Sequence, residues 1–220
     1  MGILAGMAGL EHGIGEILQG NRAPDGIMFP SWPGSAFFHI VAGEPAMSII
    51  PNLLVSGMLT MLFSLIFIIW ACMFAQRKNG SLILILLSII MLLVGGGFGP
   101  PLLGIIIGAA ATQMHEPLSG LRTHISTEFQ NITTSIWPWF LGACVIAWLL
   151  LFPGLSILEY FFGVNKPNLI PVIFFLALGL LLLTIFSGFV CDCDSTSRVF
   201  DDRTNGEIYS TRMNENDGSS

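Results

Sequence analysis

The sequence predicts an all-α integral membrane protein, a bundle of four or five transmembrane helices followed by a disordered C-terminal tail. Composition is the first reason, since 53% of the residues are hydrophobic, 10% are charged and the mean hydropathy is +0.78. Such a chain is too apolar for a domain whose whole surface meets water. The second reason is that apolar residues gather in five segments, which are residues 3–19, 48–74, 81–112, 137–160 and 169–190.

Three of these segments are long enough to cross a bilayer as single helices. Segments 48–74, 137–160 and 169–190 each reach the roughly 20 apolar residues that a hydrocarbon layer of about 30 Å requires. Aromatic residues lie at both ends of the second one, as in the belts at membrane interfaces. Pro153 should kink that helix, because proline removes a backbone donor.

Segment 81–112 carries no charge and is too long for one straight span, so we expect it to bend. Glycine is costly inside a helix and proline cannot donate to one. We therefore predict a helix, a break and a second helix, as either a discontinuous span or a re-entrant hairpin. The positive-inside rule favours the hairpin and segment length favours a single crossing, so the side of the tail stays open. The residues of the predicted break are Gly95, Gly96, Gly97, Gly99, Pro100 and Pro101.

The first segment has no basic start and no cleavage site, so it does not read as a signal peptide. Its length leaves open whether it spans the membrane fully. On a helix, one arc is made of small residues and two ionisable ones, which favours close packing against another helix. The members of this arc are Gly2, Ala5, Gly9, His12, Gly13, Glu16 and Gly20.

A second polar pattern follows on the next segment, where Asn52, Ser56, Thr60 and Ser64 recur at every fourth residue. One interpretation is hydrogen bonding between helices. The other is a polar interior shared with His12. The sequence does not decide between them.

Other classes of site and partner are disfavoured. Most of the acidic excess lies in the tail and no basic patch exists, so nucleic acid is not an expected partner. No spacing of histidines and cysteines resembles a zinc signature, and we expect no metal and no cofactor. No catalytic motif is present either, so we expect no enzymatic activity. The predicted domains are a helical membrane domain, residues 1–190, and a polar acidic tail, residues 191–220.

Two functional classes remain. The first is a small transporter or channel-like protein, with a polar interior built from His12, Glu16 and Asn52 near the break. The alternative is a non-catalytic accessory or scaffold subunit of a membrane complex, in which the glycines serve only close packing. The expected partners are the lipid bilayer and either another membrane protein or a second copy of the chain. The expected location is the cell membrane, as a multi-pass protein.

Overall fold

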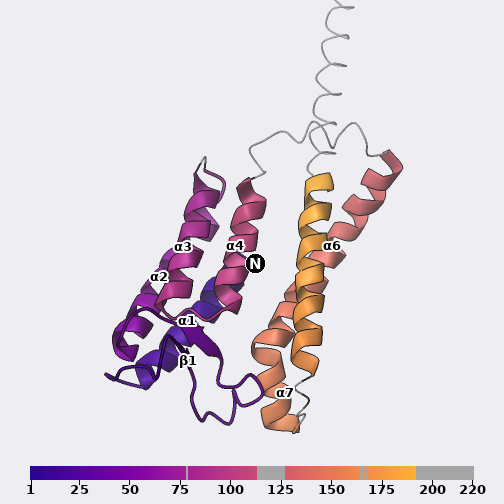
Figure 1. Cartoon of the computed structure of the whole chain (residues 1–220). Coiled ribbons are helices and arrows are strands. Elements are labelled where there is room, and N and C mark those ends of the chain that lie inside the picture. Colours follow the sequence, from indigo (N-terminus) through magenta and orange to yellow (C-terminus); the bar gives the residue numbers. More distant parts are fainter. Residues whose placement is uncertain (78, 113–126, 164–165, 167, 192–220) are drawn as a thin grey trace, which may run out of the picture. The chain divides into compact units, whose positions relative to one another are not determined.

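The computed structural model describes residues 1–77, 79–112, 127–163, 166 and 168–191. This part of the protein is mostly helical, as predicted, with one small sheet (Figure 1). The chain divides into two compact units, Met1–Pro117 with Val145–Ala177 and Leu118–Cys144 with Leu178–Ser220. The predicted disordered tail lies outside the described residues, apart from its first residue, Cys191.

Three helices are long and apolar enough to cross a membrane. They are α2 (Leu53–Met73), the stretch Glu128–Leu149 of α6 (Thr127–Leu149), and Leu169–Cys191. The second lies further toward the N-terminus than the predicted segment 137–160. A π-helical turn, η2 (Leu150–Gly154), contains Pro153 and separates α6 from the short α7 (Leu155–Phe162). The expected irregularity at Pro153 is therefore present.

The helix α1 (Gly2–Leu18) packs closely on α2, running in the opposite direction. A Cβ atom at Gly13 would lie 2.9 Å from the carbonyl oxygen of Gly57, and one at Gly57 would lie 2.6 Å from that of Gly13. No side chain fits between these two backbones. The predicted contact of the small-residue arc with another helix is confirmed at Gly2, Gly9 and Gly13 but not at Gly20, which lies beyond the end of α1 with no atom near the space for a Cβ. Ile3 and Ile14 on the other side of α1 are exposed.

Segment 81–112 forms two helices that lie side by side in opposite directions, α3 (Gly80–Val94) and α4 (Gly99–Thr112). A Cβ atom at Gly108, late in α4, would lie 3.2 Å from the carbonyl oxygen of Ser81, early in α3. The predicted break is thus confirmed, and it reverses the chain. With its 15 residues, α3 is about 22 Å long, shorter than the hydrocarbon layer of about 30 Å.

Two polar residues of α2 cap the C-terminal end of α3. The hydroxyl groups of Ser56 and Thr60 lie 2.5 Å and 2.7 Å from the carbonyl oxygen of Val94. The last carbonyls of a helix have no partner within it, so these hydroxyls supply donors that α3 lacks. The interpretation of the stripe as hydrogen bonding between helices is confirmed for these two positions.

The connection between α1 and α2 folds back over α1. Its strands β1 (Met28–Pro30) and β2 (Pro45–Met47) pair in antiparallel fashion. Hydrogen bonds continue beyond them, since the amide of Ser31 donates to the carbonyl of Glu44 at 2.9 Å. The side chain of Gln19, at the end of α1, donates to the carbonyl of Ser31 at 2.9 Å. These contacts fix Ser31 and Glu44 against α1.

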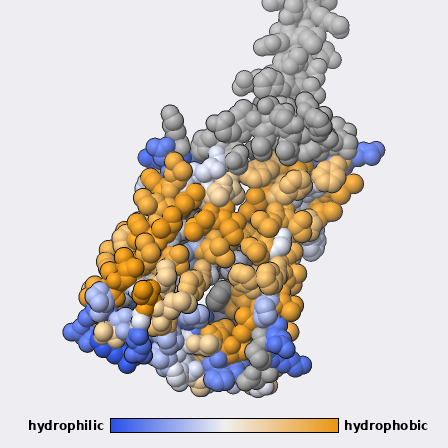
Figure 2. Space-filling view, in the orientation of Figure 1, coloured by the Kyte–Doolittle hydropathy of each residue, from blue (hydrophilic) through white to orange (hydrophobic). Residues whose placement is uncertain are grey.

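Large apolar side chains are exposed along the outside of the helices. Figure 2 shows hydrophobic residues along the visible helices, with hydrophilic ones near the helix ends. On α2 this exposed row lies opposite the buried Ser56, Thr60 and Ser64. Its members are Val55, Met58, Leu62, Leu65, Ile69 and Met73. The helix therefore has its polar side chains inside and its apolar ones outside.

The glycine contact gives a first prediction, with Gly9→Leu as the test. A Cβ atom at Gly9 would lie 2.6 Å from the terminal carbon of Met91 and closer still to Ser64. Leucine should push α1 away and cost about 1–3 kcal/mol of stability. Thermal unfolding in detergent measures this loss. The control is Ile3→Leu on the exposed side, and equal midpoints for the two variants would contradict the contact.

Candidate functional site

His12 is the centre of a buried polar cluster. It lies on α1 and is 2% exposed. Its Nδ1 atom is 2.8 Å from the hydroxyl of Ser31, and its Nε2 atom is 3.3 Å from the Oε2 atom of Glu44. Both partners belong to the connection that folds over α1. The imidazole is thus held at both ring nitrogens by a segment distant in sequence.

Glu44 reaches His12 from an unusual backbone conformation. Its φ angle is +54°, and that of Ala42 is also +54°. Residues other than glycine rarely adopt such angles, and each costs on the order of 1–3 kcal/mol. The side chain is nevertheless 4% exposed, and the contact of its Oε2 atom with His12 Nε2 at 3.3 Å is an ion-pair contact without the geometry of a hydrogen bond. The fold therefore buries the carboxyl group of Glu44 at the cost of a strained backbone.

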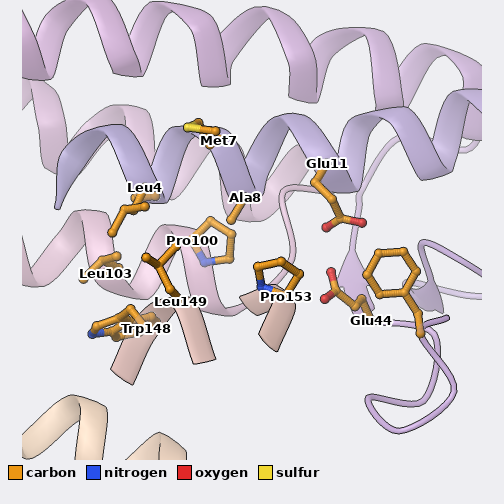
Figure 3. A pocket seen from close by; sticks show the side chains of 12 residues that line it. Leu4, Met7, Ala8, Glu11, Glu44, Pro100, Leu103, Trp148, Leu149 and Pro153 are labelled. Carbon is orange, nitrogen blue, oxygen red and sulfur yellow. The ribbon is translucent and has the colours of Figure 1, made fainter. Parts of the chain in front are cut away.

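Glu11 completes the cluster. Figure 3 shows the carboxyl groups of Glu11 and Glu44 pointing toward each other. Within the described chain, one candidate ligand atom from each of Glu11, His12 and Glu44 lies within 4.8 Å of the other two. The Oε1 atom of Glu11 is buried and also lacks a hydrogen-bond partner in that part of the chain. The cluster thus gathers two carboxyl groups and one imidazole.

Glu16 lies one turn further along α1 and is 0% exposed. Neither of its carboxyl oxygens has a hydrogen-bond partner in the part of the chain that the structure describes. The group lies against the break, because a Cβ atom at Gly95 would come 2.5 Å from its Oε2 atom. Similarly, a Cβ atom at Gly97 would come 2.5 Å from Cε1 of His12. The break and the two ionisable residues of the arc therefore meet.

Of the remaining predicted site residues, Pro100 lines a cavity beside Glu11 and Glu44, and Asn52 lies at the start of α2. Asn52 caps the start of α2, where its side chain accepts a hydrogen bond from the amide of Val55 at 3.1 Å. It also donates to Asn21 at 2.5 Å. In these described contacts, Asn52 is not part of the group around His12. Gly99, Pro100 and Pro101 form the first turn of α4, where amides have no helical partner and proline is tolerated. Gly96 donates its amide to the carbonyl of Met91 at 2.7 Å.

A cavity of about 230 Å³ lies beside the cluster. Glu11 and Glu44 are its only charged lining residues, and the others are apolar (Figure 3). They come from α1, the α1–α2 connection, α4, and the junction of α6 with η2. Among the described residues, no lysine or arginine forms a salt bridge with Glu11, Glu16 or Glu44. Within the described part of the chain, the carboxyl groups of this site therefore lack a fixed positive partner, and His12 is the basic side chain beside Glu44.

The sequence interpretation singled out His12 and Glu16 but missed Glu11, Ser31 and Glu44. Glu11 lies outside the small-residue arc, so helical periodicity does not group it with His12. Its adjacency to His12 was the available signal. Glu44 carried no local signal, because its position depends on the pairing of β1 with β2.

No protein family, no curated protein and no solved structure matches this chain. Its function must therefore be inferred from the geometry of the site.

The contact between the break and His12 gives a second prediction, with Gly97→Ala as the test. Gly97 has a φ angle of +70°, and Gly34 has one of +68° but no atom near the space for a Cβ. Alanine at either position bears a similar backbone strain, about 1–2 kcal/mol. Only Gly97→Ala also displaces His12, so it should cost about 1–3 kcal/mol more than Gly34→Ala. Thermal unfolding in detergent compares the two, and equal losses would show that the break does not press on the imidazole.

Proposed function

We propose that this chain is a multi-pass membrane protein of the transporter or channel type, with an interior site that holds a cation, either a proton or a metal ion. Three helices of sufficient length support membrane insertion. The exposed apolar row on α2 suits lipid better than water. If α1 and the α3–α4 hairpin each count as one further membrane segment, the total is five, within the four or five that the sequence predicts.

The buried Glu16 at the helix break is the observation that carries the proposal. Ionisable groups at membrane depth are costly, and they often mark the path of an ion or proton. Transporters place such groups where interrupted helices end. Glu16 lies at the C-terminal end of α3, where the helix dipole is negative, so this helix end does not stabilise a carboxylate. A bound cation or proton compensates that charge.

The scaffold alternative keeps one specific support. The backbones of Gly13 and Gly57 touch, and the hydroxyls of Ser56 and Thr60 bond to α3. These contacts explain close packing without any transport. They do not explain why a buried carboxyl group with no cationic partner among the described residues lies at the break, and this favours the transporter class.

The third prediction tests transport with Glu16→Gln. Glutamine keeps the size of the side chain but cannot exchange a proton or neutralise a cation. In liposomes, the wild type should carry protons or cations, and Glu16→Gln should abolish this flux while eluting like the wild type in detergent. Glu128→Gln changes an exposed glutamate of α6 and should keep the flux.

The contrary result is equally clear. Wild-type liposomes that carry no flux for protons, common cations or small solutes would reject transport. If the protein also copurified with a larger membrane complex, the scaffold class would replace it.

A further inference from the structure

We infer that Glu11, His12 and Glu44 form a binding site for one divalent transition-metal ion, of the Zn²⁺ or Mn²⁺ type. The inference deepens the proposed function and rests on it in one respect, because it names the class of cation that the interior takes. It does not depend on transport being observed. Glu16 is not one of the ligands, and this difference separates the two proposals experimentally.

The donor geometry is the first argument. Bonds of about 2.1 Å to a tetrahedral ion place neighbouring ligand atoms about 3.4 Å apart. The separation of His12 Nε2 from Glu44 Oε2 is 3.3 Å, so this edge of the coordination shell already has the required length. One carboxyl oxygen of Glu11 lies within 4.8 Å of a ligand atom of His12 and of one of Glu44. A rotation of the Glu11 side chain would complete three ligands.

The orientation of the imidazole is the second argument. A histidine that binds a metal through one ring nitrogen usually donates from the other to a fixed acceptor. His12 Nδ1 lies 2.8 Å from the hydroxyl of Ser31, which is itself completely buried. With the proton on Nδ1, the lone pair of Nε2 faces Glu44. Ser31 thus fits the role of a positioning residue.

Charge is the third argument. With both carboxyl groups ionised and the imidazole neutral, the cluster would carry a charge of −2, and burying this charge without compensation would be costly. In the described chain no lysine or arginine pairs with either carboxylate. A divalent cation would neutralise the group and would bind the buried oxygens of Glu11 and Glu44 more strongly than their neighbours His12 and Trp32 do. The strained backbone of Glu44 is then explained, because it directs the carboxyl group toward the position of the ion.

The ligand types select the metal. Imidazole nitrogen suits Zn²⁺ and other transition metals, and carboxylate oxygen suits Mn²⁺ as well as the harder ions. Ca²⁺ needs six to eight oxygen ligands, and Mg²⁺ binds through oxygen and water. Three protein ligands leave at least one coordination position open. Here Glu11 and Glu44 line the cavity, so an open position would face it (Figure 3).

The test uses the full chain, purified in mild detergent and equilibrated separately with Zn²⁺, Mn²⁺, Ca²⁺ and Mg²⁺. Metal content after removal of free ions should be about one Zn²⁺ or Mn²⁺ per chain, with little Ca²⁺ or Mg²⁺ retained. Glu44→Gln and His12→Gln should lose this ion. The matched control is His39→Gln, because His39 also contacts a glutamate, Glu159 at 3.0 Å, but is 72% exposed. It should keep the ion.

Ser31→Ala adds a measurement of metal affinity, which would not change if Ser31 only stabilised the fold. It removes the acceptor behind His12 but no ligand, so it should weaken affinity by about 10–100-fold and leave the stoichiometry near one. If Glu44→Gln does not fold, spin-echo spectroscopy of the Mn²⁺-loaded wild type decides instead. Coupling of Mn²⁺ to an imidazole nitrogen supports the site, and absence of that coupling overturns it.

The remaining outcomes separate this inference from transport. A wild type that retains no more Zn²⁺ or Mn²⁺ than Glu44→Gln overturns the metal site, and transport stands if Glu16→Gln still abolishes flux. A wild type that retains one ion but carries no flux keeps the metal site and rejects transport. Retention of the ion by Glu16→Gln supports the ligand set, and its loss would contradict that set.

Discussion

The close approach of α1 to α2 is the constraint on which the other features depend. Because the backbones of Gly13 and Gly57 touch, the arc that carries His12 and Glu16 is buried inside the fold. The chain then needs partners for these groups, and the break at Gly95 and Gly97 lies directly against them. A side chain at any of these glycines would separate the elements. The buried charge and the close packing are therefore two consequences of one arrangement.

The helical part of the fold was predictable because its signals are local. The small-residue arc of α1 and the glycine–proline break are each visible within about two turns of sequence, and both are present. The direction of the chain after the break was not predictable, since charge and length favoured different answers. The structure shows antiparallel helices. The length of segment 81–112 favoured a single crossing, but the segment holds two short helices, and α3 has only 15 residues.

The site was only half predictable, for a physical reason. His12 and Glu16 share a helical face, so periodicity finds them. Glu44 contacts His12 because the register of the β-hairpin and a positive φ angle bring it there. A glutamate in the sequence predicts neither the register nor the positive φ angle. Asn52 was expected in the interior because it continues the stripe of Ser56, but it stands at the helix start, where its amide is more useful as a cap.

The β1–β2 pairing has a consequence for how the cluster binds any ligand. Residues 12 and 44 are far apart along the chain, and bringing them together costs loop-closure entropy. Folding has already incurred that cost, because the register of Pro30 with Pro45 and the bond from Ser31 to Glu44 order the connection beforehand. The cluster is thus preorganised. Binding and folding are then thermodynamically linked. A change that loosens the hairpin lowers the affinity for the ligand, and a bound ligand stabilises the paired strands.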